Sequence, residues 1–140
     1  MLHSPFVMKL PHSSREPDVQ VVLPTSLERI KDTYLDGPAD LVVEIISPES
    51  DTRDRVDKFS EYQAGGVPEY WIIDPIYEEA LFYQRDEQGL FQRAPLDEHG
   101  VYHSRILPRL ALSPTTFWQQ NLPDGAETSQ MVEAMLGGQP

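Results

Sequence analysis

The chain has 140 residues and a net charge of −12, from 11 Lys and Arg against 23 Asp and Glu. Its length fits a single domain, and 39% hydrophobic with 24% charged residues indicates a folded protein and excludes disorder. The negative charge argues against tight nucleic-acid binding through broad phosphate neutralisation, so any nucleic-acid chemistry depends on metal ions or a local basic patch. Because the chain has no Cys, disulfides, thiolate zinc sites and a cysteine nucleophile are excluded.

The sequence carries no membrane or export signal that we can identify. It has no run of about 18 apolar residues, the length that an ordinary membrane-spanning helix needs. Its first ten residues lack the basic region and long apolar stretch that are typical of a signal peptide. We therefore expect a cytoplasmic protein with no membrane partner.

The first half of the chain predicts strands and one short helix or turn. Alternating apolar residues over 6–10 and β-branched residues over 18–23 predict two adjacent strands, with a polar turn at 12–15 between them. A short, weakly amphipathic helix or turn that includes Leu27, Ile30 and Leu35 is expected next.

An almost continuously apolar run follows over 41–46 and is typical of a strand buried on both faces. Residues 51–64 carry charges on one side and apolar residues at helical spacing, and the glycines after them suit a helix stop. These two patterns predict a strand, a short loop and a helix in succession.

Further strands are expected at 69–75, in a hairpin over 80–93, and at 101–107. A helical tail is expected over 113–140, with its last helix at 127–136. The sequence therefore predicts a single domain over 1–140 with a mixed α/β core over about 6–112.

Glu44 is the one carboxylate within the apolar run, and a buried carboxylate is costly unless it is paired, protonated or bound to a cation. Asp40 shares its strand and face, but their Cα atoms are separated by roughly 13 Å, so these two cannot chelate one ion. Asp18 opens a different strand, and its carboxylate can meet that of Glu44 if the two strands pair. Two convergent carboxylates with an open coordination position suit Mg²⁺ or Mn²⁺.

A cation that could orient a water molecule at such a site is Lys58, on the helix that follows the strand of Glu44. Each member also has a structural interpretation. Lys58 could form an i,i+4 ion pair with Asp54, Glu44 could be hydrogen-bonded at a strand end, and Asp18 could simply start a strand after a proline. No single residue decides between the two interpretations.

Arg53 and Arg55 form a tight cluster of cations with Lys58 and could hold a substrate phosphate. Acidic neighbours at 51, 54 and 57 dilute the positive field, so a helix surface of salt bridges is an equal alternative. The aromatic residues of the strands, which could stack on bases, are better explained by packing in the core or in a dimer. These are Tyr70, Trp71, Phe82 and Tyr83.

The ordered set of motifs resembles the Uma-type putative restriction endonuclease domain, a bacterial family of the PD-(D/E)XK nuclease superfamily. The resemblance spans roughly residues 6–112. It is carried by Pro17-Asp18-Val19, by residues 38–50, by Asp54-Arg55 with Lys58, and by residues 66–75. It implies a restriction-endonuclease-like α/β fold with a mixed sheet, a divalent metal ion and hydrolysis of phosphodiester bonds in DNA.

The resemblance also implies roles for individual residues. Asp18 matches the PD carboxylate, and Glu44 matches the acidic residue of the (D/E)XK strand. Ile46 stands where the wider superfamily has lysine, so Lys58 on the following helix is the matching cation. By this resemblance Asp18, Glu44 and the backbone carbonyl of Ile45 would ligate Mg²⁺ or Mn²⁺, and Lys58 would orient the attacking water or stabilise the developing charge.

Members of the family usually begin with a further helix and strand, with another acidic residue on the helix, and this chain starts after that point. The resemblance therefore implies a core without this first piece, and an exposed apolar edge or face. We expect a homodimer, or an unstable and inactive monomer. The leading hypothesis is a metal-dependent DNA endonuclease. The alternative is a non-catalytic, N-terminally truncated dimerisation module, whereas a zinc-binding regulatory domain is disfavoured without Cys.

Overall fold

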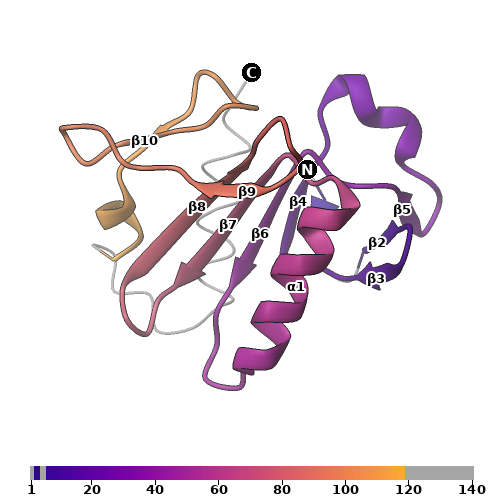
Figure 1. Cartoon of the computed structure of the whole chain (residues 1–140), viewed down its shortest axis with the longest axis horizontal. Coiled ribbons are helices and arrows are strands. Elements are labelled where there is room, and N and C mark those ends of the chain that lie inside the picture. The colour runs from indigo at the N-terminus through magenta and orange to yellow at the C-terminus, as the bar shows by residue number, and fades with distance from the viewer. Residues whose placement is uncertain (1, 4–5, 119–140) are drawn as a thin grey trace.

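A computed structural model describes residues 2–3 and 6–118 of the chain. Figure 1 shows a twisted sheet with helix α1 lying across one of its faces. The sheet has six strands in the order β1-β4-β6-β7-β8-β9. In chain order these are Leu2–His3, Val19–Val21, Leu41–Ile45, Glu69–Asp74, Glu79–Arg85 and Phe91–Arg93. Since β6 and β7 are parallel and the other neighbouring pairs antiparallel, the sheet is mixed, as the family resemblance implies.

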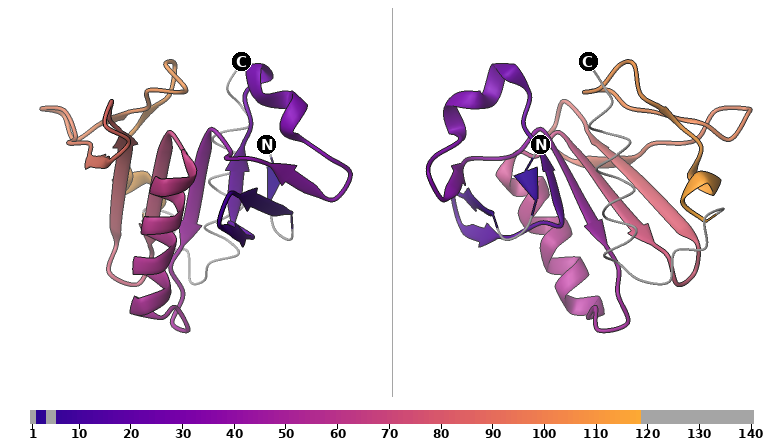
Figure 2. Two further views of the ribbon diagram at one scale, coloured as in Figure 1. Left: turned by 45° about the vertical axis from the view of Figure 1, so that its right-hand side comes forward. Right: turned by 180° about the vertical axis from the view of Figure 1, so that it is seen from behind.

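Two smaller sheets accompany this main sheet, and Figure 2 shows the indigo and violet strands of the first beside one edge of the main sheet. One has the order β3-β2-β5 and consists of β2 at Val7–Leu10, β3 at Ser13–Arg15 and β5 at Tyr34–Asp36. The other pairs β10 at Tyr102–His103 with β11 at Ala111–Leu112. Two short 3₁₀ helices, η1 and η2, span Pro24–Arg29 and Pro114–Phe117.

Helix α1 spans Thr52–Gly65 and connects the parallel strands β6 and β7. Its start is capped because the Asp51 side chain accepts a hydrogen bond of 2.8 Å from the Arg53 N–H. It ends at Gly66, whose φ of 91° is a left-handed conformation that glycine adopts without strain. The predicted helix over 51–64 is therefore confirmed, and it follows β6 closely enough to lie beside Glu44.

The core has two apolar clusters, one on each face of the main sheet. Strands β6 and β7 are buried along their whole length, as the run 41–46 predicts. The cluster on the α1 face includes Tyr62 and Tyr70, and the cluster on the opposite face includes Trp71 and Phe82. The prediction that these strand aromatics belong to the core is confirmed for Tyr70, Trp71 and Phe82, and Tyr83 packs half-buried against the α1 face.

The expectation that the first two predicted strands are adjacent is wrong. Strand β2 pairs with β3 and β5 in a separate sheet, whereas β4 pairs with β6. Residues 13–15, expected to be part of a turn, form β3 instead. Apolar alternation identifies a strand but not its partner, and here Met8 packs on the α1 face while Val19 packs on the other.

Other local expectations also need correction. Leu35 is not part of the short helix, which ends at Arg29. It lies on strand β5 and is fully buried. Val56 has a helical spacing that predicts burial, yet it is 60% exposed and lines an open hollow between α1 and β8. The strand expected over 101–107 is confined to β10. The predicted helix at 127–136 lies outside the described residues, and none of the helices within them is long and apolar enough to cross a membrane.

Candidate functional site

Strands β4 and β6 bring Asp18 and Glu44 together. Their antiparallel register pairs Val19 with Val43, which places Asp18 beside Glu44 at the end of the ladder. The Asp18 N–H lies 3.4 Å from Glu44 Oε1, and the Ile45 N–H donates a hydrogen bond of 2.7 Å to Asp18 Oδ2. The sequence predicts that these two residues meet if their strands pair. The strands do pair, and Asp18 and Glu44 lie side by side.

Helix α1 covers Glu44 from the face of the sheet. Lys58 Nζ lies 3.4 Å from Glu44 Oε2 and 3.2 Å from Asp54 Oδ2. Lys58 therefore makes both contacts that the sequence allows, the i,i+4 pair with Asp54 and the contact with Glu44. One turn later, the Tyr62 hydroxyl donates a hydrogen bond of 2.5 Å to the same Glu44 Oε2. The sequence pattern indicates that Tyr62 faces the core, but not that its hydroxyl contacts Glu44.

Burial controls the charge state of Glu44, whose side chain is 6% exposed. Burial raises the pKa of Glu44 to about 7, although Lys58 and the hydrogen bond from Tyr62 act in the opposite direction. Burial lowers the pKa of Lys58, but the negative charges of Glu44 and Asp54 outweigh it, so Lys58 stays protonated. Burial and the charge of Glu44 raise the pKa of Tyr62, which therefore remains a hydrogen-bond donor.

The residues present suit a hard divalent cation. The N–H and C=O of one strand residue point to the same side, and because the Ile45 N–H faces Asp18, the Ile45 carbonyl faces that side too. Within residues 2–3 and 6–118 there is no group of three or more His, Cys, Asp or Glu side chains that could hold a metal ion. The protein would thus offer two carboxylates and one carbonyl. Mg²⁺ accepts such a set, since it usually keeps several waters and binds substrate phosphates.

Arg15 joins the charged network from strand β3. Its guanidinium donates to Glu61 Oε2 at 2.6 Å and to Asp54 Oδ1 at 2.9 Å. Burial raises the pKa of Asp54, but Lys58 and Arg15 outweigh it, so that pKa lies below its ordinary value. No local pattern in the sequence indicates this role of Arg15, because its contacts join positions 39 and 46 residues apart.

The other two cations predicted at the site lie elsewhere on α1. Arg53 is exposed, and Arg55 is half-buried. Arg55 lines a hollow of about 370 Å³ between α1 and strand β8, together with Phe59 and Tyr83. Asp18, Glu44 and Lys58 do not line this hollow. The predicted cluster of three cations is therefore divided, and only Lys58 contacts Glu44.

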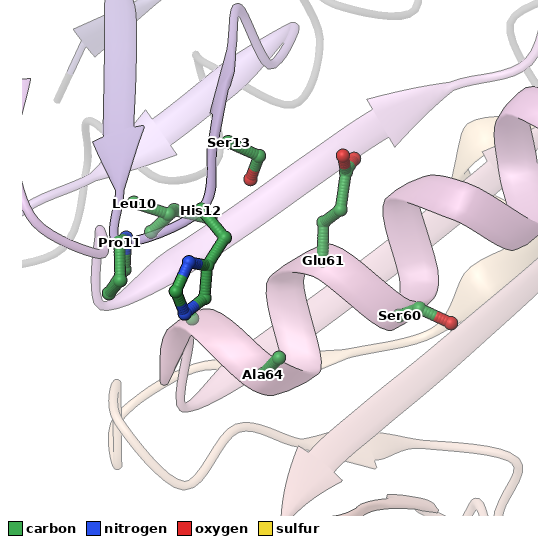
Figure 3. A pocket seen from close by; sticks show the side chains of 8 residues that line it. Leu10, Pro11, His12, Ser13, Ser60, Glu61 and Ala64 are labelled. Carbon is green, nitrogen blue, oxygen red and sulfur yellow. The ribbon is translucent and has the colours of Figure 1, made fainter.

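A second hollow, of about 170 Å³, lies between the β2–β3 turn and the last turns of α1. Figure 3 shows the His12 side chain extending from the β2–β3 turn toward α1 and the Glu61 side chain projecting from α1. The remaining lining is mostly apolar or small, and none of the predicted site residues belongs to it. This hollow is therefore separate from the carboxylate pair.

Two of the other buried carboxylates, Asp40 and Glu69, are structural. Asp40 accepts hydrogen bonds from the Leu23 N–H and the Ser26 hydroxyl. Glu69 is fully buried, and its oxygens accept from Trp71 Nε1, Ser104 Oγ, Arg105 N and Ile106 N. The oxygens of Asp40 and Glu69 thus serve hydrogen bonds within the fold. Asp18 and Glu44 also accept hydrogen bonds, but they differ from Asp40 and Glu69 because they face each other at the end of the β4–β6 ladder.

Comparisons with known proteins agree with this fold. Residues 2–115 match the family model described as "Uma2: Putative restriction endonuclease". The structure is similar to the crystal structure of a putative nuclease belonging to DUF820 from Anabaena variabilis ATCC 29413, with a TM-score of 0.61 and 18% identity. The match covers 79% of this chain and 63% of that one, so this chain spans just under two thirds of that protein's length. No curated protein matches this chain.

Proposed function

The chain belongs to the Uma2 putative restriction endonuclease family, and from this premise we propose that it is a metal-dependent endonuclease that hydrolyses phosphodiester bonds in DNA. The observation that carries the proposal is the meeting of Asp18 and Glu44 at one end of the β4–β6 pair, with Lys58 beside Glu44. Two carboxylates that can hold a divalent cation and a positive side chain beside them suit metal-assisted phosphodiester hydrolysis.

In this proposal Asp18, Glu44 and the Ile45 carbonyl hold Mg²⁺ or Mn²⁺. The bound cation supplies electrophilic activation of the scissile phosphate and of a water molecule. Glu44 must lose its proton to act as a ligand, since only the carboxylate binds metal well. Tyr62 keeps the Glu44 carboxylate oriented toward Asp18 through its hydrogen bond to Oε2.

Lys58 contributes positive charge that does not depend on pH in the physiological range, because its pKa is raised. Its contact with Glu44 keeps the amine within 3.4 Å of the proposed metal ligand. From there it would orient the attacking water or stabilise the charge that develops on the phosphate in the transition state.

DNA binding by a chain of net charge −12 must be local and transient. We assign the phosphate contacts to Arg53 and Arg55, which lie in the first turns of α1, before Lys58. We also propose that the protein acts as a cytoplasmic homodimer. Ile76 and Tyr77, at the β7–β8 turn, support an intermolecular contact because they are 50% and 79% exposed.

One observation favours the alternative of a non-catalytic interaction module. The Glu44 side chain is only 6% exposed, Lys58 and Tyr62 contact its Oε2, and the Asp18 N–H lies 3.4 Å from its Oε1. A carboxylate held in this way could serve the fold alone. Activity and metal binding must therefore be measured together.

The test is nicking of supercoiled plasmid by the purified chain at low salt, in Mn²⁺ and in Mg²⁺. Glu44→Gln and EDTA are the two negative controls, and Glu87→Gln, at an exposed position, controls for the loss of one negative charge. We expect nicking that is lost in both negative controls and kept in Glu87→Gln. A folded wild-type chain that neither nicks DNA nor binds Mn²⁺ would refute the proposal and support the non-catalytic module.

A further inference from the structure

A continuous chain of charged contacts runs from strand β3 to the buried carboxylate of Glu44. Arg15 binds Asp54 Oδ1 at 2.9 Å, and the other oxygen of Asp54 lies 3.2 Å from Lys58 Nζ. Lys58 Nζ then lies 3.4 Å from Glu44 Oε2. Arg15 is anchored independently, because its guanidinium also lies 2.6 Å from Glu61 Oε2. Arg15 is thus held by two carboxylates of α1, Asp54 and Glu61, and not by Asp54 alone.

Lys58 is shared between two carboxylates of different exposure. The side chain of Asp54 is 42% exposed and that of Glu44 is 6% exposed, while the two distances from Lys58 are nearly equal. An ammonium group keeps more of its hydration beside an exposed carboxylate than beside a buried one. Asp54 therefore competes with Glu44 for Lys58. It would draw Lys58 toward solvent if its negative charge were not also bound by a second cation.

Arg15 shares that charge. Its contact occupies Oδ1 of Asp54, which leaves only Oδ2 for Lys58. The planar guanidinium can bind Asp54 and Glu61 at the same time, an arrangement that the single ammonium of a lysine reproduces poorly. Without Arg15, both oxygens of Asp54 would be free to attract Lys58.

We propose that Arg15 is a positioning residue: by binding Oδ1 of Asp54 it weakens the attraction of Asp54 for Lys58, which therefore keeps its contact with Glu44. This inference deepens the proposed function and rests on it as far as catalysis is concerned. Arg15 lies three residues before Asp18 in the chain, so the segment 15–18 supplies one carboxylate of the site directly and orients its cation indirectly. The geometric part, the effect of Arg15 on the Lys58–Glu44 contact, holds whether or not DNA is cleaved.

The kinetic test compares kcat and KM for plasmid nicking in Mn²⁺. Arg15→Gln should lower kcat about tenfold with KM within twofold of wild type, since a misplaced catalytic group costs rate more than binding. Adding Asp54→Asn should restore most of kcat, because the competitor for Lys58 is then gone. Arg93→Gln, a matched loss of an exposed arginine, should leave both constants unchanged.

The alternative is that Arg15 only holds β3 against α1, and this alternative predicts a different result. Asp54→Asn would then leave Arg15→Gln impaired, since removing a second partner cannot repair a lost anchor. Failure of the double variant to recover kcat therefore overturns the proposal. Equal kcat in Arg15→Gln and wild type overturns it too. Thermal unfolding of each variant establishes that the folded proteins are being compared.

A readout independent of cleavage separates this inference from the proposed function. The chain has three lysines, Lys9, Lys31 and Lys58, so the side-chain resonances of ¹³C,¹⁵N-lysine can be assigned by substitution. In metal-free protein, Glu44→Gln should shift the Lys58 resonance in the wild-type background and leave it almost unchanged in Arg15→Gln. Equal shifts in both backgrounds overturn the proposal, and this arm decides the matter even if the wild-type chain proves inactive.

Discussion

Replacing Glu44 with Gln should remove most of the pH dependence of folding stability between pH 5 and pH 8. The pKa of Glu44 is raised from 4.5 to about 7 in the folded chain because the carboxylate is buried. Between these values the folded chain holds a proton that the unfolded chain has lost. The contribution of Glu44 to stability is therefore fully present below about pH 4.5 and is lost as the pH rises through 7.

The size of the effect follows from the same pair of values. The difference between 4.5 and about 7 corresponds to about 3 kcal/mol of unfolding free energy. About 2 kcal/mol of this should be lost between pH 5 and pH 8, because part of the transition lies below pH 5. An amide at position 44 does not ionise, and it can still accept the hydrogen bond from Tyr62.

The assay is urea unfolding of the metal-free protein, with EDTA present, at several pH values from 5 to 8. Wild type should lose about 2 kcal/mol across this range, whereas Glu44→Gln should stay nearly level. Glu87→Gln, which changes the net charge equally at an exposed position, should follow wild type. If Glu44→Gln retains the full wild-type dependence, the buried carboxylate is not the group that titrates and the reasoning is wrong.

Three further predictions follow from the site and its surroundings. If Glu44 is a metal ligand with a pKa of about 7, the Mn²⁺ affinity measured by calorimetry should fall about tenfold per pH unit below pH 7. Binding at pH 6 should release about one proton. A pH-independent affinity would contradict this prediction. Lys58→Met should lower plasmid nicking about 100-fold and raise the pKa of Glu44 further, which moves the Mn²⁺-binding profile to higher pH; an unmoved profile shows that Lys58 does not stabilise this carboxylate. Glu69→Leu should cost about 3 kcal/mol in urea unfolding, because it leaves buried donors unpaired, while Mn²⁺ affinity stays at the wild-type value; unchanged stability would refute the structural role of Glu69.

Strands β4, β6, β7, β8 and β9 of the main sheet and helix α1 could be predicted from sequence because their signals are local, whereas β1 at Leu2–His3 was not predicted. The continuous apolar run before Ser47 indicated a buried strand, and Asp51 and Gly66 stand at the two ends of α1. These features depend on periodicity and on residues that favour helix ends, both of which act within a few positions of the chain. The Glu69–Asp74 strand and the hairpin that follows were recognised for the same reason.

The partners of the strands could not be derived in this way. The same apolar alternation occurs in β2 and in β4, yet β2 belongs to the small sheet and β4 to the main one. The strand expected over 101–107 stops early because residues 104–106 turn to donate hydrogen bonds to Glu69. A partner that lies more than 20 residues away, as Val43 does from Val19, leaves no local signal at either position.

The candidate site shows the same division. The sequence alone determined that Glu44 is a carboxylate in a buried strand, that a helix bearing Lys58 follows it, and that Asp18 starts another strand. Only the tertiary structure decided that Asp18 and Glu44 meet, that Tyr62 and Lys58 share one oxygen of Glu44, and that Arg15 holds Asp54. The physical reason is that residue type and spacing determine local conformation, whereas pairing register and helix packing determine which distant charges come within hydrogen-bond distance.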